Sequence, residues 1–359
     1  MCSKNRVLTR FASYLLLLAI FLPANGLAQD TPGYISIGLL LPDQGHPEIT
    51  AAAELAIDEA NKAGAYKGRK FKLQVRTAEG FWGAGSKESV SLVYEDQVRA
   101  IIGSLDGRNG HLAEQVATKS HLTYIECYAT EPTLSQAFVP WFMRVVPNDN
   151  QQSELITAQI LKEGGSRVVI LSNGSYDCKY ALKSLTKSLA REAGISPMVI
   201  TLDPENPELN KLTQRINGHN PDHLVLPFDA AFMKDLVDVL TDAYPDLKIY
   251  GTLHFAIGAE KRKESWKQYE GMYLTGPLNS GQEPAFPAGS HAAFIYDAVN
   301  LVIHAIREVG TQREAITEAI SGTTYANGAS GSIAFDDLGN RKDAARLYQI
   351  QEGVPQLIK

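Results

Sequence analysis

Polar residues in short turns, each directly after an apolar run, are the residues of this sequence best suited to bind a ligand. The turn at 104–110 follows the run Ala-Ile-Ile-Gly and leads into a helical pattern. N–H groups exposed at such a helix start can bind a carboxylate, and Arg108 can add a charge-assisted contact. The turn therefore predicts an anion-binding site. Helix capping by Asp106 or Asn109 is the alternative.

Other turns of the same kind carry rings, hydroxyls and charges. Tyr128 offers an aromatic wall and Thr130 a hydroxyl after one apolar run, while Asp229 and His254 follow apolar runs in the second half of the chain. Trp82, in a loop that follows a predicted strand, is expected to form a further wall of the site. Packing between domains is the competing role for that loop.

Enzyme and metal signatures are missing from the sequence. It contains neither a G-x-S-x-G elbow nor a G-x-x-x-x-G-K-S/T phosphate loop. His219 and His223 have a spacing that could hold zinc on a helix, but Pro221 interrupts that helix, and a solvated loop is expected. No catalytic residue, metal or cofactor is predicted. An exported α/β hydrolase built from scattered residues remains a minor alternative.

Alternating strand and helix patterns must position these turns. Short apolar runs at 34–41, 70–77 and 100–103 alternate with amphipathic segments at 48–63 and 87–96, which predicts a parallel sheet covered by helices. In the first helical segment, apolar residues recur with a period of three to four and form one stripe. That stripe consists of Ile49, Ala52, Ala53, Ala56, Ile57 and Ala60.

A second series of alternating runs begins near Asp149, so two similar lobes are expected. A chain of 359 residues is longer than one hydrophobic core usually serves. Crossings are predicted at Pro147, near Pro277 and within 328–331. The first lobe would comprise 29–147 plus 277–328, and the second 148–276 plus 329–359. Because ligands bind beyond the carboxyl ends of parallel strands, the polar turns should face one another across a cleft.

The N-terminus predicts export. Lys4, Arg6 and Arg10 precede an apolar run of about ten residues, too short to span a bilayer, and small residues follow it. Cleavage is expected near Ala28, which removes residues 1–28 and leaves a soluble periplasmic protein, expected to be a monomer. The net charge of −6 does not favour nucleic acid. Cys127 and Cys178 are too few for a disulfide framework, so free thiols are expected.

Ordered motifs make the mature chain resemble the type I periplasmic binding proteins, specifically the branch that binds leucine, isoleucine and valine. The motifs are Ala100-Ile101-Ile102-Gly103, Ala129-Thr130-x-Pro132, Phe142-Met143-Arg144-x-x-Pro147-x-Asp149-x-x-Gln152, Tyr296-Asp297-Ala298, and Gly331-x-Ile333-x-Phe335-Asp336-x-x-Gly339. The resemblance implies an α/β fold of two Rossmann-like lobes with parallel sheets, joined by a three-strand hinge that closes on a small molecule. It also implies a partner, the membrane permease of an ABC transporter.

The resemblance assigns roles to individual residues. Asp106, Gly107 and Thr130 match positions that hold a ligand α-carboxylate, and Tyr176 matches a tyrosine that closes over the ligand from the second lobe. In the amino-acid binders of this family an acidic residue binds the ligand's ammonium group, but the corresponding turn here, 251–254, has none. Asp229, in the neighbouring loop, could substitute for it. The expected ligand is therefore an amino acid or another organic acid. A ligand-sensing receptor protein of the same fold is the alternative.

Overall fold

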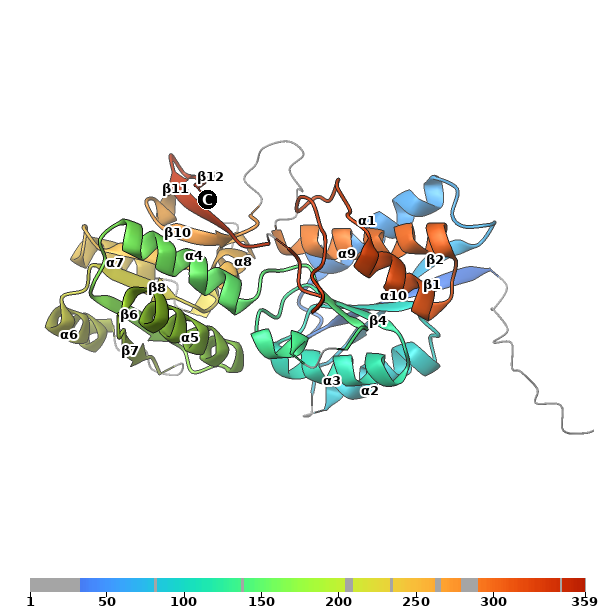
Figure 1. Cartoon of the computed structure of the whole chain (residues 1–359), viewed down its shortest axis with the longest axis horizontal. Coiled ribbons are helices and arrows are strands. Elements are labelled where there is room, and N and C mark those ends of the chain that lie inside the picture. Colours follow the sequence, from blue (N-terminus) through green and yellow to red (C-terminus); the bar gives the residue numbers. More distant parts are fainter. Residues whose placement is uncertain are drawn as a thin grey trace, which may run out of the picture. The chain divides into compact units, whose positions relative to one another are not determined.

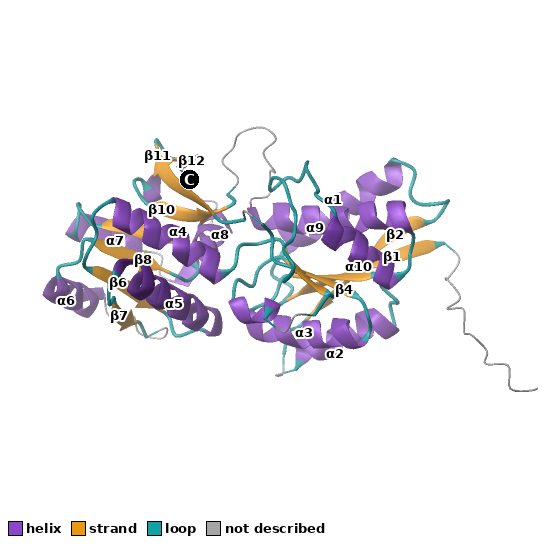
Figure 2. Cartoon of the chain, viewed as in Figure 1, coloured by secondary structure: helices purple, strands orange, loops and turns teal. Residues whose placement is uncertain are grey.

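The computed structural model describes residues 33–80, 83–136, 139–203, 209–232, 235–261, 266–278, 290–342 and 344–358. Two β-sheets organise these residues, and helices cover both faces of each sheet (Figure 2). The chain divides into Met1–Tyr34 and Ile35–Lys359, and nearly all described residues belong to the second part. The predicted signal peptide, residues 1–28, lies outside the described residues.

The first sheet has five strands in the order β2-β1-β3-β4-β5. β1 pairs in parallel with β3, β3 with β4, and β4 with β5. β3 and β4 are buried along their whole length, as expected for parallel strands covered on both faces. The strands are β1 (Tyr34–Leu41), β2 (Lys70–Thr77), β3 (Ala100–Gly103), β4 (Thr123–Glu126) and β5 (Phe142–Arg144).

Helices α2 and α3 lie on one face of the first sheet, and α1, α9 and α10 lie on the other (Figure 1). The stripe predicted for α1 is confirmed, because all six of its apolar residues are buried. The helices are α1 (Pro47–Lys62), α2 (Ala84–Tyr94), α3 (Gly107–Lys119), α9 (Ser290–Val309) and α10 (Arg313–Gly322), with a 3₁₀ turn at Pro132–Ser135.

The second sheet has seven strands in the order β12-β11-β10-β9-β8-β6-β7. The strands are β6 (Val168–Ser172), β7 (Met198–Thr201), β8 (His223–Leu226), β9 (Lys248–Gly251), β10 (Tyr273–Gly276), β11 (Arg346–Gln351) and β12 (Val354–Leu357). β6 to β10 run parallel, but β10 pairs with β11 and β11 with β12 in antiparallel fashion. The prediction of two lobes with parallel sheets is therefore confirmed, and an antiparallel C-terminal hairpin extends the second sheet.

Alternation along the central strands divides the second lobe into two layers of packing. Val168 and Ile170 on β6 pack toward residues of α4 and α5, whereas Val169 and Leu171 belong to the core that includes α6, α7 and α8. The helices are α4 (Asp149–Lys162), α5 (Tyr176–Ser188), α6 (Leu209–His219), α7 (Leu236–Ala243) and α8 (Leu253–Lys261), with short turns at Leu189–Ala193, Ala230–Phe232 and Trp266–Tyr269.

The chain passes from the first sheet to the second after β5, returns after β10 and passes back before β11. Arg144 donates its N–H to Gly339 O over 2.8 Å and accepts from Arg341 N over 3.0 Å. A Cβ at Gly339 would meet Phe142 O at 2.1 Å, so the tight turn requires glycine. The domain boundary predicted at 328–329 stays a prediction. The segment around 339–341, which was assigned to the second lobe, is hydrogen-bonded to β5 of the first sheet.

Candidate ligand-binding site

A cavity of about 280 Å³ lies at the carboxyl ends of strands from both sheets. Its walls come from the loops and helices that follow β1, β3 and β4 in the first lobe and β6, β8 and β9 in the second, with one residue from α9. This is the edge at which ligands bind in open α/β sheets. The lining residues are Pro42, His46, Ser104, Asp106, Tyr128, Asn173, Ser175, Asp177, Cys178, Pro227, Phe228, Asp229, His254, Lys261 and His291.

Three aspartates from different loops line the cavity: Asp106, Asp177 and Asp229. Asp106 caps α3 by accepting from Asn109 N over 2.8 Å. Asp177, on α5 of the second lobe, accepts from the N–H of Gly107 over 2.9 Å. At the start of α3, where the sequence predicted a site for a ligand carboxylate, the N–H of Gly107 therefore donates to a carboxylate of the protein itself. Burial is the main cause that raises the pKa of Asp177, and the nearby Asp106 raises it further.

Tyr128 forms the centre of an aromatic group in the cavity. Its ring stacks on His254 with centroids 4.5 Å apart and lies 5.2 Å from the ring of His291. His254 Nε2 lies 3.0 Å from the backbone oxygen of Tyr128, which links the two lobes. Burial first, and then Asp229, Asp177 and Asp106, raise the pKa of the Tyr128 hydroxyl. These three carboxylates, all of which line the cavity, thus disfavour ionisation of the phenol.

Three basic side chains, His46, Lys261 and His291, also line the cavity, and His46 lies 3.4 Å from Asp43 and 3.7 Å from Glu48. Lys261 Nζ, at the end of α8, lies 3.1 Å from Nδ1 of His46. His291 is 6% exposed, and its Nε2 lies 2.9 Å from the hydroxyl of Ser104. Burial is the main cause that lowers the pKa of His291 well below its usual value, and Lys261 and His46 add to the effect. His291 Nδ1 has no hydrogen-bond partner in the described parts of the chain.

The pair of Ser104 and His291 has the separation of a nucleophile and its base. Two features oppose that role. The imidazole is held in its neutral form by burial, so it is a poor proton acceptor. Within the described ranges, no carboxylate orients it through Nδ1. The arrangement therefore favours a polar contact to a ligand over nucleophilic chemistry.

Asp106, Tyr128, Asp229 and His254 are the predicted site residues that line the cavity. Gly107 is not among the lining residues, and its N–H donates to Asp177, which is one of them. Trp82 lies outside the described residues, and its predicted role stays a prediction.

Arg108, Thr130 and Tyr176 do not line the cavity. The exposed guanidinium of Arg108 lies over the ring of Tyr176, 5.1 Å from its centroid. Thr130 is buried, its backbone oxygen accepts from Asp149 N over 2.8 Å, and its side chain lowers the pKa of the Asp149 carboxyl. These side chains thus have partners within the protein.

Several lining residues were not predicted, notably Asp177, Lys261 and His291. Asp177 ends the polar turn 173–177, which directly follows the apolar run of β6. The signal for Lys261 and His291 is weak, because they lie in helices, where a charged residue usually faces solvent. Cys178, which also lines the cavity, and Cys127 are both buried and free, which confirms the expectation of free thiols.

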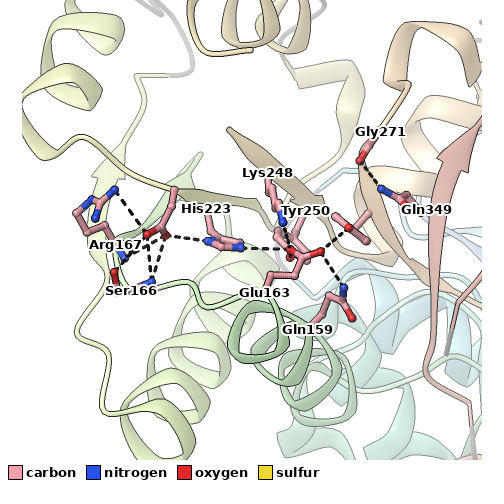
Figure 3. A network of polar contacts seen from close by, with 11 residues as sticks. Gln159, Glu163, Ser166, Arg167, His223, Lys248, Tyr250, Gly271 and Gln349 are labelled. Atoms are coloured by element: carbon pink, nitrogen blue, oxygen red, sulfur yellow. Dashed lines mark hydrogen bonds and ion pairs between the residues drawn. The ribbon is translucent and has the colours of Figure 1, made fainter. Parts of the chain in front are cut away.

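A second polar cluster, which we call the Glu163 cluster, lies at the amino ends of β8, β9 and β10 (Figure 3). Burial favours a higher pKa for Glu163, but hydrogen bonds from Tyr273, Tyr250, Gln159 and Lys248 outweigh it and lower the pKa to about 2. The cluster consists of Gln159, Glu163, Ser166, Arg167, Asp222, His223, Lys248, Tyr250 and Tyr273.

His223 connects the two carboxylates of the Glu163 cluster. Its Nδ1 lies 2.7 Å from Asp222 Oδ1, and its Nε2 lies 3.3 Å from Glu163 Oε2. The expectation that His219 and His223 form a solvated loop is therefore wrong for His223, which is 2% exposed at the start of β8. The described residues hold no group of side chains suited to a metal ion.

The sequence matches the family model described as "Periplasmic binding protein" over residues 34–354. The chain therefore belongs to the periplasmic binding protein family. A Leu/Ile/Val-binding protein of Rhizobium johnstonii is 25% identical over 342 residues, which cover 89% of this chain and 92% of that protein.

Solved structures have the same fold. The branched-chain amino acid transporter substrate-binding protein LivJ of Streptococcus pneumoniae, in complex with isoleucine, has a TM-score of 0.76 at 20% identity and covers 91% of this chain and 99% of its own. An ABC transporter solute-binding protein of R. palustris, in complex with benzoate, has a TM-score of 0.77 at 16% identity, with 91% and 96% covered. The predicted type I periplasmic binding protein fold is thereby confirmed. Within the described ranges, no helix has the length and apolar character needed to cross a membrane.

Proposed function

We propose that this chain is an exported solute-binding protein that captures a small organic ligand in the cavity and presents it to the permease of an ABC transporter. The observation that carries the proposal is the cavity itself, whose walls come from strand ends of both lobes. Membership of a binding-protein family supports it, as do the names of relatives that bind leucine, isoleucine, valine or benzoate. A binding role without catalysis is part of the proposal.

The size and chemistry of the cavity favour a small carboxylate-bearing ligand. About 280 Å³ is just below the roughly 300–1,000 Å³ of sites for drug-sized molecules, which suits an amino acid or a compact organic acid. The lining combines apolar surface from Phe228 and Tyr128 with charged groups of both signs. Such a surface would fix the orientation of a small polar ligand.

Hinge closure would bring the two halves of the site together. Contacts across the cavity support this part of the proposal, since Gly107 donates to Asp177 over 2.9 Å and His46 lies 3.1 Å from Lys261. A ligand that contacts both walls would shift the population toward the closed form. Residues 1–28 would direct export to the periplasm and be removed.

A thermal-shift screen of the mature chain tests the proposal. Common amino acids, aliphatic acids and aromatic acids are added singly, and calorimetry gives the Kd of each compound that raises the Tm, because a ligand that binds the native state stabilises it. We expect one small group of related compounds to bind with one molecule per chain. If no compound of these classes raises the Tm, the proposed function is wrong for this ligand class.

A further inference from the structure

We propose that Glu126 is a positioning residue of the binding site: its carboxylate holds the loop 127–129 and thereby fixes the ring of Tyr128 in the wall of the cavity. Glu126 is not among the residues that line the cavity, so it would act on affinity without touching a ligand. This role rests on the proposed function and deepens it, because it names a residue behind the cavity wall that sets the affinity of the site.

The carboxylate of Glu126 gathers the N–H groups of the loop that follows it. Glu126 is the last residue of β4 and is buried. Its Oε1 accepts from three successive backbone N–H groups, those of Cys127 over 3.0 Å, Tyr128 over 2.8 Å and Ala129 over 3.1 Å. Its Oε2 accepts from the hydroxyl of Tyr124. Successive N–H groups that converge on one point are an arrangement with which proteins bind anions. Here the anion belongs to the chain itself, so the loop is folded around it.

The buried guanidinium of Arg144 holds carbonyl groups of the same loop. Glu126 and Arg144 face each other in the register of β4 and β5. Arg144 donates to the backbone oxygen of Ala129 over 3.3 Å and to that of Glu131 over 2.7 Å. It also donates to Oδ1 of Asn340 over 2.9 Å. A buried anion therefore holds the N–H groups of the loop and a buried cation holds two of its carbonyl groups.

The loop depends on the carboxylate for its conformation. In the described parts of the chain, the N–H groups of Tyr128 and Ala129 have no other acceptor. Ala129 is buried, so water is not at hand to replace the carboxylate. Because a buried N–H without an acceptor is destabilising, a loop that lost the charge of Glu126 would rearrange.

The loop carries Tyr128, whose ring belongs to the wall of the cavity. The ring stacks on His254 with centroids 4.5 Å apart, and the backbone oxygen of Tyr128 lies 3.0 Å from Nε2 of His254. On its other side the ring lies 5.2 Å from that of His291. Side chains that contact a ligand must be held to within about 0.5 Å by their surroundings. A rearranged loop would move the ring and its contact with His254 together.

Glu126→Gln tests the role, with isoleucine and benzoate as the probes. The substitution keeps the size of the side chain but loses its charge, so neutral hydrogen bonds replace charge-assisted ones. We expect the Kd of the probe that binds, measured by calorimetry, to rise about 10-fold. Glu163→Gln is the matched control, because it removes another partly buried carboxylate that accepts from tyrosine hydroxyls. Its Kd should equal that of the wild type.

The Tyr128→Ala background shows whether Glu126 acts through the ring. Without the ring, Glu126→Gln should raise the Kd by less than about 2-fold, whereas independent effects would multiply. Hydrogen exchange of the wild-type chain, followed by mass spectrometry, examines the loop without a ligand. The amides of 127–129 should be protected, although they lie outside a strand or helix.

Three results would overturn the positioning role. They are a Glu126→Gln variant that loses stability but keeps its Kd, an equal rise in Kd with and without the Tyr128 ring, and amides of 127–129 that exchange as in an unfolded peptide. If Glu126→Gln does not fold, Glu126→Asp takes its place, because its carboxylate is one methylene too short to reach all three N–H groups. If neither probe binds the wild-type chain, the positioning role fails, while the proposed function fails only if the wider screen finds no ligand.

Discussion

Opposite edges of the second sheet carry partly buried carboxylates in two different electrostatic situations. At the amino ends of β8, β9 and β10, Glu163 accepts from two tyrosines and a glutamine and pairs with Lys248. At the carboxyl ends, Asp177 accepts one backbone N–H and lies near other aspartates. The pKa of Glu163 is lowered to about 2, whereas that of Asp177 is raised.

The opposite pKa shifts of Glu163 and Asp177 distinguish a carboxylate that stabilises the fold from one that is available to a ligand. A carboxylate whose partners all lie in the same chain stabilises the fold in its ionised form. A carboxylate with too few partners is destabilising in that form unless a ligand supplies the counter-charge. The Glu163 cluster is therefore expected to affect stability, and the aspartates of the cavity to affect affinity.

The largest expected effect is on stability at the Glu163 cluster. Glu163→Gln leaves Lys248 without its counter-charge and replaces the charged acceptor of Tyr250 and Tyr273. It should lower the free energy of unfolding by about 2–4 kcal/mol. Urea unfolding followed by circular dichroism measures the loss. Ligand affinity should not change. An unaltered urea midpoint, or a clearly higher Kd for the ligand, would contradict the assignment of Glu163 to stability and not to binding.

The same substitution has a characteristic pH dependence. Since the pKa of Glu163 falls from 4.5 to about 2 on folding, its contribution is present above pH 4.5 and is lost as the pH falls toward about 2. The wild-type protein should therefore lose its advantage over Glu163→Gln in that interval. A stability difference that stays constant from neutral to acidic pH would contradict the assignment.

Asp149 is an intermediate case, because the Thr130 side chain lowers its pKa while Oδ2 has no hydrogen-bond partner in the described ranges. Burial is the main cause that raises the pKa of Asp149 to about 6. Thr130→Val should lower the free energy of unfolding by about 1–2 kcal/mol, because the Thr130 side chain then no longer stabilises the ionised carboxylate. Ligand affinity should stay near the wild-type value. Weaker binding at unchanged stability, measured by calorimetry and urea unfolding, would return Thr130 to the binding site.

The smallest expected stability change is at Asp177. Because its pKa is raised above the unfolded value of 3.8, the folded state disfavours its charge increasingly as the pH rises from 3.8 through the folded pKa. Asp177→Asn should therefore be as stable as the wild type at low pH and about 0.5 kcal/mol more stable at neutral pH. Melting curves of both proteins across this range test the sign. Destabilisation at neutral pH would place Asp177 with Glu163 as a structural charge.

Local patterns were sufficient to predict much of the fold and the edge at which the cavity lies. The apolar stripe of α1 and the runs that form β1 and β3 depend on periodicity and composition, which are properties of neighbouring residues. The rule for the carboxyl ends of strands then predicted Asp106, Tyr128, Asp229 and His254 as site residues, and these line the cavity. The C-terminal hairpin was not predicted. Its two strands adjoin in the sequence, but the strand against which it pairs, β10, is remote.

Residue type alone could not predict which charged side chains have partners. Arg108 and Thr130 suit a carboxylate by chemistry, yet the fold pairs them with Tyr176 and Asp149. His223 looked like part of a solvated loop, yet β8 carries it between two carboxylates.

The sequence by itself determined the alternation of strands and helices, the two lobes and the family, because these depend on local periodicity and on ordered motifs. Only the tertiary structure decided which charges are paired. Asp177 and Gly107 are 70 positions apart, and Glu163 and Tyr273 are 110 apart. Whether a carboxylate is stabilised depends on the groups within a few ångströms of it. Folding brings those groups together from distant parts of the chain.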